Sequence, residues 1–320
     1  MKDYLSVTFT IAVLNEEKRI GRCLESILSL DYPKDKVEII VCDGGSQDRT
    51  VEIASTYGCR IYHNRRRLAE PALADAFRQA KNELVVHMAA DNVLSEKSWL
   101  KRMALPFIEN SDVVGAFCKV VNDPKDNPFN KYFNSDTDPF NAFVYGYASH
   151  PDKFCKLYKV ITKKENYVIY DYRLKDFPLL ALAQGFILKK RDFDRSLETD
   201  YDDILPILDL IREKKKIAYV TNTGIYHYSL KGFCDFLRKY NKRLENALRA
   251  SFIKRRSFLS RQRKLKQYFW LPYSLSIILP FITACRDCLK KRKLYYFYHP
   301  IACFGLTIII IFNILKRLIK

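Results

Sequence analysis

The chain has 320 residues, of which 48% are hydrophobic and 14% aromatic, so it can bury a substantial core, and global disorder is excluded. Its net charge of +19 lies almost entirely in residues 229–320, which contain 21 Lys and Arg but three acidic residues; this asymmetry indicates contact with nucleic acid or an anionic membrane. Nine scattered cysteines argue against a disulfide framework and a zinc site, and the first residues lack the pattern of a cleaved signal peptide.

Strand and helix patterns alternate along the first 91 residues. Runs of apolar and β-branched residues predict strands, and apolar residues at helical spacing predict helices between them. This repetition predicts an α/β fold with a mostly parallel, doubly wound sheet. The predicted strands are residues 6–14, 36–43, 59–64 and 83–91, and the predicted helices are residues 16–30, 46–58 and 71–82.

Polar residues follow three of these strands. Asn15 and Glu17 follow the first strand, Asp43 ends the second, and Asp91 ends the fourth. In a doubly wound sheet, ligands bind beyond the carboxyl ends of the strands. We therefore expect a nucleotide at this edge of the sheet.

The pattern is weaker in the next part of the chain. Residues 121–180 are rich in Asp, Asn, Pro, Tyr and Lys and predict irregular structure with some helix. Beyond them, residues 179–193 predict a strand that contains Gly185, residues 200–216 a helix, and residues 217–229 a strand pair or strand–turn–strand. The predicted α/β domain therefore covers residues 1–228.

Residues 232–250 predict an amphipathic helix with a basic side. Phe236 and Tyr240 share its apolar side, and Arg238 lies on the other. Two interpretations are open: the helix lies on an anionic membrane surface, or it docks on the domain as an ordinary surface helix. We assign residues 229–267 to a basic, membrane-proximal segment.

Residues 268–320 contain two hydrophobic segments. Residues 294–315 are free of charge over the length that spans a bilayer core, with basic residues behind them, and predict a transmembrane helix. Residues 268–284 contain Pro272 and Pro280, and they span the bilayer, re-enter it or lie in its interface. Because the cations flank apolar segments, a membrane is favoured over nucleic acid as the partner. The predicted location is the cell membrane with the globular part in the cytosol, and positive flanks on every side leave the C-terminal topology open.

The first half of the chain resembles family 2 glycosyltransferases of the GT-A fold. In that family a strand is followed by Asn-Glu and a helix, and the second strand by Asp-(Asp/Gly)-Gly-Ser-x-Asp-x-Thr, which here is Asp43 to Thr50. The resemblance continues to about His227. It implies inverting transfer of a sugar from a nucleotide-sugar donor of the UDP or GDP type.

The resemblance also implies that Asn15, Glu17 and Asp43 bind the nucleotide. An Asp at a strand end can accept a hydrogen bond from the imide N–H of a uracil-like base, and the two glycines after it let the backbone turn close to a ligand. The alternatives are local. Asp43 is then part of a strand–turn–helix cap, and Glu17 is an acid in the first turn of a helix.

Family members usually carry Asp-x-Asp after the fourth strand, where the carboxylates hold a divalent cation that neutralises the nucleotide diphosphate. Aligned without gaps, Ala89 stands at the first Asp and Asp91 at the second, which is the usual direct metal ligand. The resemblance therefore implies a Mg²⁺ or Mn²⁺ site at Asp91 with one carboxylate fewer, for which Asn92 or Asp43 substitutes in part. His227 completes the metal shell or contacts the diphosphate, unless it is structural.

Asp202 and Asp203 stand where the family has Glu-Asp before a helix, and His227 follows Asp203 by 24 residues, as the family spacing requires. The resemblance implies that Asp203 is the general base that takes the proton of the acceptor hydroxyl, with Asp202 beside it. A carboxylate at a helix start is otherwise a cap. Gly185 matches the small-residue loop where the acceptor and the donor sugar meet.

These features favour a membrane-anchored, inverting glycosyltransferase whose acceptor is a lipid-linked or surface glycan, because the predicted anchor places the site beside the bilayer. Ala89 motivates a rival interpretation, a catalytically impaired nucleotide-sugar-binding or scaffold protein of the same fold. A basic nucleic-acid-binding protein is a second rival, against which the hydrophobic segments argue.

Overall fold

The computed structural model describes residues 4–64, 69–192, 204–247 and 257–318. The chain forms two compact units. The division predicted from the sequence, with boundaries after residues 228 and 267, distinguishes a globular domain from a basic and a hydrophobic segment. It does not refer to compact units, and it stays a prediction. One unit contains Met1–Val121, Phe154–Arg173 and Leu180–His227, and the other contains Asn122–Lys153, Leu174–Leu179 and Tyr228–Lys320.

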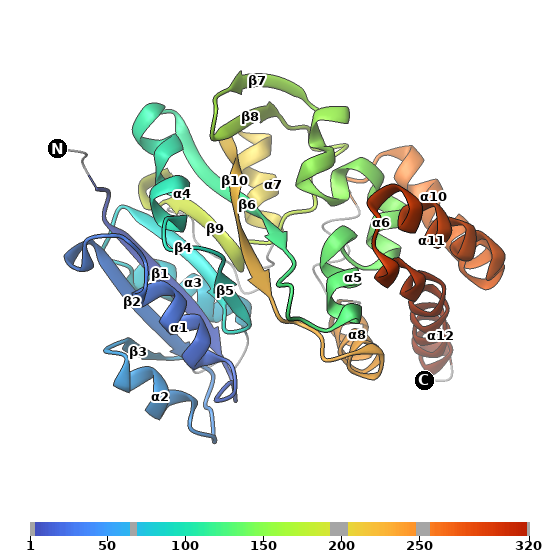
Figure 1. Cartoon of the computed structure of the whole chain (residues 1–320), viewed down its shortest axis with the longest axis horizontal. Helices are drawn as coiled ribbons and strands as arrows, with labels where there is room; N and C mark the ends of the chain where they lie inside the picture. Colours follow the sequence, from blue (N-terminus) through green and yellow to red (C-terminus); the bar gives the residue numbers. More distant parts are fainter. Residues whose placement is uncertain (1–3, 65–68, 193–203, 248–256, 319–320) are drawn as a thin grey trace. The chain divides into compact units, whose positions relative to one another are not determined.

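A ten-stranded mixed sheet forms the first unit, in the order β3-β2-β1-β4-β9-β6-β10-β8-β7, with β5 paired to β10 (Figure 1). The strands are β1 (Val7–Val13), β2 (Val37–Asp43), β3 (Arg60–His63), β4 (Leu84–Ala89), β5 (Asn92–Leu94), β6 (Val113–Val121), β7 (Lys159–Lys163), β8 (Tyr167–Asp171), β9 (Gln184–Lys189) and β10 (Lys216–His227). The helices are α1 (Ile20–Leu28), α2 (Thr50–Thr56), α3 (Ala69–Gln79), α4 (Trp99–Glu109) and α7 (Leu205–Arg212).

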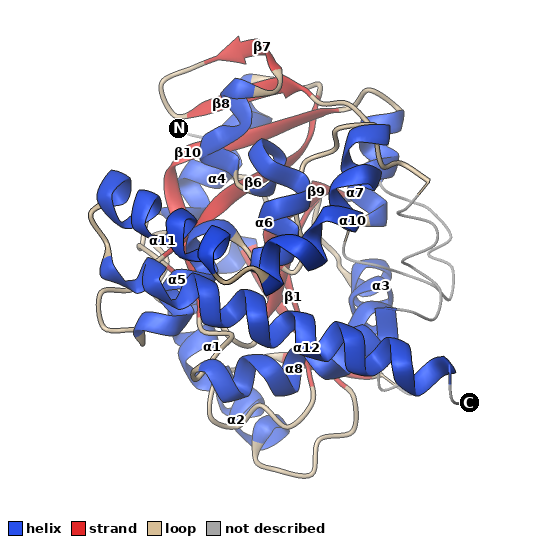
Figure 2. Cartoon of the chain, turned by 90° about the vertical axis from the view of Figure 1, so that its right-hand side faces the viewer, coloured by secondary structure: helices blue, strands red, loops and turns tan. Residues whose placement is uncertain are grey.

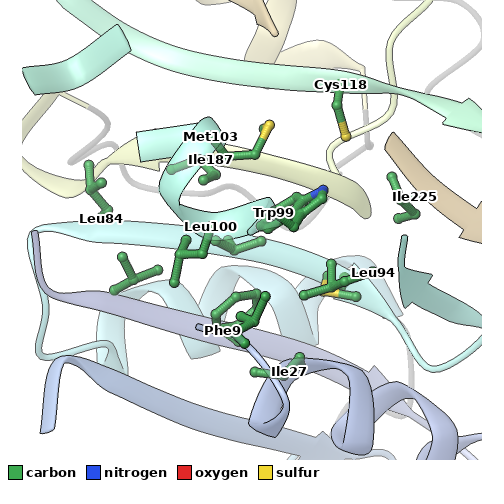
Figure 3. Close-up of a cluster of buried hydrophobic side chains, with 14 of the residues drawn as sticks. Phe9, Ile27, Leu84, Leu94, Trp99, Leu100, Met103, Cys118, Ile187 and Ile225 are labelled. Atoms are coloured by element: carbon green, nitrogen blue, oxygen red, sulfur yellow. The ribbon is translucent and has the colours of Figure 1, made fainter. Parts of the chain in front are cut away.

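The first half of this sheet is parallel and carries helices on both faces. Strands β3, β2, β1 and β4 all pair in parallel. On one face Phe9 of β1 packs against Trp99 of α4, with ring centroids 6.2 Å apart (Figure 3). On the other face Phe77 of α3 lies 5.9 Å from the ring of His87 in β4. The doubly wound arrangement predicted for this half is confirmed.

His87 makes the stability of this layer pH-dependent. It is fully buried, with Thr10 Oγ1 2.6 Å from its Nδ1. Burial lowers the pKa of His87 from 6.5 to about 3, because the imidazolium would lose its hydration. Between pH 6.5 and about 3, His87 is protonated in the unfolded chain but neutral in the folded chain. The free energy of unfolding therefore falls as the pH drops below about 6.5.

We expect wild type to lose about 2 kcal/mol of unfolding free energy through His87 between pH 7 and pH 5. The variant His87→Gln, which cannot titrate, should lose that much less over the same interval. Urea unfolding of both proteins at the two pH values measures the difference. His63→Gln replaces an imidazole that is 77% exposed and serves as the control. Equal losses in wild type and His87→Gln would contradict the prediction.

The second half of the sheet is mixed. β9 runs antiparallel to both β4 and β6, whereas β10 is parallel to β6 and antiparallel to β8. The strand pair predicted at residues 217–229 is wrong, because β10 is one strand with a register shift between Tyr219 and Gly224. A Cβ at Gly224 would lie 2.6 Å from Val121 Cγ1, so glycine is what lets β10 stay paired with β6 there.

Residues 121–180 contain more regular structure than predicted. Strands β7 and β8 form an antiparallel hairpin, and β8 pairs with β10. β7 is largely exposed and carries Lys159 and Lys163 at its ends, so it lacks the apolar alternation that identifies a half-buried strand. The helices expected in this region are present.

The second unit is helical. Two of its helices begin with proline after a capping side chain, because proline fits the first helical position. Asn127 Oδ1 accepts from Asn130 N at 2.9 Å, and Asp138 Oδ1 accepts from Asn141 N at 2.8 Å. The helices are α5 (Pro128–Asp136), α6 (Pro139–Tyr145), α8 (Phe233–Ala247), α10 (Arg261–Leu275), α11 (Ile278–Lys291) and α12 (His299–Leu318).

The amphipathic helix predicted near residue 232 is α8, and its apolar side is covered by protein. Phe236 is fully buried, and its ring centroid lies 5.5 Å from that of Phe129 in α5. On α12, a Cβ at Gly305 would lie 2.8 Å from Leu237 of α8, so the two helices are in close contact. Of the two interpretations left open by the sequence, the structure supports docking on protein.

The two hydrophobic segments differ in shape. Among the described residues one helix, Leu294–Lys316, is long and apolar enough to cross a membrane. The preceding segment is broken, because α10 and α11 meet at an angle of 93° where Ile277 has a left-handed φ of +58°. A single straight span is therefore excluded for residues 268–284.

Candidate functional site

The carboxyl ends of the parallel strands meet at one edge of the sheet. Ala12 of β1 pairs with Cys42 of β2 on one side and with Ala89 of β4 on the other. β9 runs antiparallel and so begins at this edge, where Gln184 follows the loop from the preceding segment. β10 ends at the same edge with His227, next to β5. The fold thus gathers the loops that carry the predicted site residues.

The loops after β1 and β2 are hydrogen-bonded to each other. Ser46 Oγ accepts from Asn15 N at 2.9 Å, and Asn15 Oδ1 accepts from Gln47 N at 2.8 Å. Asp48 Oδ2 accepts from Glu17 N at 3.1 Å. Asn15 has a φ of +56°, a conformation that Asn tolerates better than most residues. Asn15 and Glu17 therefore hold the two loops together, and their contact with a nucleotide stays a prediction.

Asp48 is a further residue that positions these two loops. Burial alone would raise its pKa, but hydrogen bonds from Thr50 Oγ1, Thr50 N and Glu17 N lower the pKa of Asp48 below its usual value. The carboxylate thus stays charged and joins the start of α2 to the loop after β1. The sequence signal for this role is the Asp-x-Thr formed by Asp48 and Thr50 at the end of the motif.

Asp43 ends β2 with a carboxylate that is 2% exposed. Its Oδ2 accepts from Gly45 N and its Oδ1 from Ser46 N, both at 3.0 Å, and His63 Nδ1 lies 3.7 Å from Oδ2. Gly45 has a φ of +92°, which favours glycine in this turn. These contacts fit the local, turn-forming interpretation of Asp43. A hydrogen bond to a base stays a prediction.

Asp91 and His227, which are far apart in the sequence, meet at the turn between β4 and β5. β5 pairs antiparallel with β10, so that Asn92 is opposite His227. Asp91 Oδ1 lies 3.6 Å from His227 Nε2. That oxygen is buried and has no hydrogen-bond partner among the described residues. Leaving a buried carboxylate oxygen unsatisfied is costly, so the arrangement suits a shared cation.

The pair fits part of the coordination shell of Mg²⁺ or Mn²⁺. Its 3.6 Å separation is less than twice a metal–oxygen distance of about 2.1 Å, so one cation reaches both groups. In the described part of the chain, no three His, Cys, Asp or Glu side chains are grouped to hold a metal. The remaining ligands would be diphosphate oxygens and water, which Mg²⁺ commonly keeps. The other carboxylate of the family motif is missing because Ala89 stands at its position.

Asn92 fixes the turn that carries Asp91. Its Nδ2 donates to Ala183 O at 2.6 Å, and Ala89 N donates to the same carbonyl at 3.1 Å. The buried side chain therefore ties the Asp91 turn to the segment before β9. The partial role as a metal ligand expected from the sequence stays a prediction, because it would use the amide oxygen Oδ1, which is buried and has no hydrogen-bond partner among the described residues.

Gly185 has a local reason to be glycine. Its φ is +73°, and an added Cβ would lie 3.2 Å from Cζ2 of Trp99. Trp99, the first residue of α4, is fully buried against the sheet (Figure 3). The packing requirement exists whether or not a sugar binds, and the acceptor role of Gly185 stays a prediction.

We expect Gly185→Ala to lower the unfolding free energy by about 1–3 kcal/mol, because it adds backbone strain and displaces the Trp99 ring. Gly58→Ala is the matched control: its φ is +71°, but an added Cβ would meet nothing within 4 Å. The control should lose less, since it tests strain alone. Urea unfolding measures both losses, and equal values would show that Trp99 does not constrain the site.

The predicted base lies outside the described residues, as do Asp202 and the rest of residues 193–203. The helix expected after Asp203 is present as α7, and the strand after it ends at His227 as the spacing predicts. The role of Asp203 stays a prediction.

Comparison with known proteins finds glycosyltransferases both among similar sequences and among similar folds. The sequence profile described as Glycosyl transferase family 2 matches residues 8–160. The chain is 24% identical over 233 residues to poly(ribitol-phosphate) beta-glucosyltransferase of Bacillus spizizenii, a match that covers 69% of this chain and 35% of the relative. It is 29% identical over 102 residues to dolichyl N-acetyl-alpha-D-glucosaminyl phosphate 3-beta-D-2,3-diacetamido-2,3-dideoxy-beta-D-glucuronosyltransferase of Methanococcus voltae, covering 30% of this chain and 32% of the relative. The chain thus spans about a third of the length of these relatives.

The fold resembles that of the mannosyltransferase PcManGT from Pyrobaculum calidifontis, solved in complex with GDP-Man and Mn²⁺. The TM-score is 0.57 at 15% sequence identity, and the match covers 99% of this chain and 89% of that one. At this identity the likeness is one of fold, and it confirms the predicted GT-A architecture.

Proposed function

We propose that this chain is a glycosyltransferase of family 2 that transfers a sugar from a UDP- or GDP-type donor to an acceptor hydroxyl with inversion at the anomeric carbon. The observation that carries the proposal is the meeting of Asp91 and His227, 3.6 Å apart, at the edge of the sheet where the parallel strands end. A carboxylate oxygen that has no hydrogen-bond partner among the residues the structure describes, and that lies beside an imidazole, suits a cation that also binds a diphosphate.

In this proposal one group of residues binds the metal and another shapes the nucleotide side of the site. Asp91 and His227 would hold Mg²⁺ or Mn²⁺ at the donor diphosphate. When bound, the cation neutralises the charge that develops on the leaving diphosphate. Asn15, Glu17 and Asp43 hold the loops after β1 and β2 in place on the nucleotide side of the site, as their hydrogen bonds support.

Asp203 is the proposed general base. It takes the proton from the acceptor hydroxyl as that oxygen bonds to the anomeric carbon, while the bond from that carbon to the diphosphate oxygen breaks on the opposite side. Displacement from the opposite side inverts the configuration. Asp202, beside it in the sequence, occupies the position of the family's Glu, and Gly185 is the second residue of β9, the strand paired with β4 before the Asp91 turn.

The proposed acceptor is a lipid-linked or surface glycan, at the cytosolic face of the cell membrane. The apolar helix Leu294–Lys316 supports a site beside the bilayer. The names of the relatives support both acceptor types, since one acts on a dolichyl phosphate-linked sugar and the other on poly(ribitol-phosphate).

Nucleotide release from a panel of UDP- and GDP-sugars tests the proposal. The full chain in detergent is assayed with Mn²⁺ or Mg²⁺, with and without EDTA, and with polyprenyl phosphate and glycan acceptors. We expect release from one donor that stops on chelation. Binding of a nucleotide sugar without release under any condition would favour the alternative that Ala89 motivates, a nucleotide-sugar-binding or scaffold protein of the same fold.

A further inference from the structure

The C-terminal unit exposes most of the large hydrophobic side chains that the described residues leave accessible. Of the 26 exposed ones, 20 belong to residues 265–315, on α10, α11, α12 and the turns between them. Phe269 of α10 and Ile278 of α11 are examples, both more than half exposed. Soluble monomers seldom expose so much apolar surface in one region, so this surface marks a site of interaction.

Helix α12 has one packed side and one exposed side. Cys303 and Leu306 are buried, whereas Ile301, Ile308 and Leu315 are 48%, 50% and 52% exposed. A seven-residue spacing keeps these three on one side of the helix, because an α-helix drifts by only about 20° per heptad. The exposed side is therefore a continuous apolar stripe along α12.

Helix α8 runs parallel to α12 along its packed side (Figure 2). Leu237 Cδ2 lies 2.8 Å from the position that a Cβ of Gly305 would take, and further along both helices Lys316 Nζ lies 3.2 Å from Glu245 Oε1. The contact thus extends over eleven residues of α12, about 16 Å at 1.5 Å per residue.

A membrane-spanning α12 would take α8 into the bilayer. Gly305 is the middle residue of Leu294–Lys316, so the start of α8 would lie at the bilayer centre. Asp235 and Arg238, which are paired with each other, and the exposed Lys242 would all lie in the hydrocarbon region. Charged side chains at that depth are strongly disfavoured unless they face a bundle interior or water, and Lys242 faces outward.

We propose that the C-terminal unit attaches to one leaflet of an anionic bilayer, with α12 lying in the plane of the interface rather than crossing it. The apolar stripe and the exposed apolar residues of α10 and α11 enter the boundary between headgroups and acyl chains, as interfacial helices do. This deepens the membrane association of the proposed function and does not depend on sugar transfer.

Charge selects the bilayer over a second copy of the chain as the occupant of this surface. Residues 229–320 carry 21 Lys and Arg against three acidic residues, and Lys264, Lys290 and Arg292 are exposed on or beside the same helices. Two such surfaces repel each other, whereas anionic headgroups attract them.

Depth-dependent fluorescence quenching tests the orientation. Ile301→Trp, Ile308→Trp and Leu315→Trp are made singly in the full chain, and each is bound to phosphatidylcholine–phosphatidylglycerol vesicles brominated either near the headgroup or deep in the acyl chain. Wild type supplies the background of Trp99 and Trp270. Ile108→Trp, an exposed position on α4, is the control outside the unit. Circular dichroism verifies that each variant is folded.

We expect the three α12 positions to be quenched equally and preferentially by shallow bromines, and binding to be lost on phosphatidylcholine alone. Deep quenching at residue 308 with shallow quenching at 301 and 315 would overturn the proposal in favour of a span. Absence of quenching with a doubled mass in light scattering would assign the surface to a second copy. Nucleotide release in detergent is measured separately. A quenching result that contradicts the interfacial orientation therefore leaves the proposal of sugar transfer intact, and an absence of nucleotide release leaves the proposed orientation intact.

Discussion

Replacing Asp203 by Asn should lower the turnover number of sugar transfer by about 10²–10⁴-fold, the range for loss of a general base, with donor affinity close to that of wild type. Asparagine keeps the shape and hydrogen-bonding capacity of the side chain but cannot take the proton of the acceptor hydroxyl. Single-turnover transfer and calorimetric binding of the donor measure the two quantities separately. A loss in turnover without a loss in binding identifies a residue that acts on the reaction rather than on the nucleotide.

Two controls make the Asp203 result specific. Asp209→Asn removes the next acid along the chain, which pairs with Arg212 on α7, and it should leave turnover near wild type. Asp202→Asn tests the register of the motif. If Asp202→Asn abolishes transfer while Asp203→Asn turns over as fast as wild type, the base is the neighbouring residue and our assignment is wrong.

The second large effect concerns Asp91. We expect Asp91→Asn to lower kcat/KM by about 10²–10³-fold, because the charge on the leaving diphosphate loses much of its stabilisation. The Mn²⁺ concentration for half-maximal activity should rise as well, since an amide oxygen binds the cation more weakly than a carboxylate. Electron paramagnetic resonance of Mn²⁺ with the protein and nucleoside diphosphate reports the binding independently of turnover.

The controls for Asp91 use its partner and a distant acid. If Asp91 and His227 act through one cation, Asp91→Asn combined with His227→Gln should be little worse than Asp91→Asn alone. Asp112→Asn removes an exposed carboxylate that pairs with Lys216 at the start of β10, and it should change neither activity nor Mn²⁺ binding. Fully additive losses from Asp91 and His227 would show that the two side chains serve different tasks.

The local patterns of the sequence were sufficient to predict the parallel half of the sheet and to place the candidate site residues at one edge of it. Alternating strand and helix periodicities fix the direction of successive strands, because a short crossover helix can join only parallel neighbours. Asp43 and Asp91 had to lie at one edge once their strands were parallel. The family motif added a role for each residue, which no periodicity supplies.

Only the tertiary structure brought Asp91 to His227 and showed how α8 is covered. The first contact depends on β5 pairing antiparallel with β10, and such long-range pairing leaves no mark in either segment alone. For the same reason β10 was mistaken for two strands, since its irregularity at Gly224 is resolved by the neighbouring Val121 of β6. The apolar side of α8 has one pattern whether it meets lipid or protein, because the hydrophobic effect depends on the area removed from water and not on what removes it. Which of the two covers it was decided by the approach of α8 to Gly305, where the absence of a side chain lets the two helices touch.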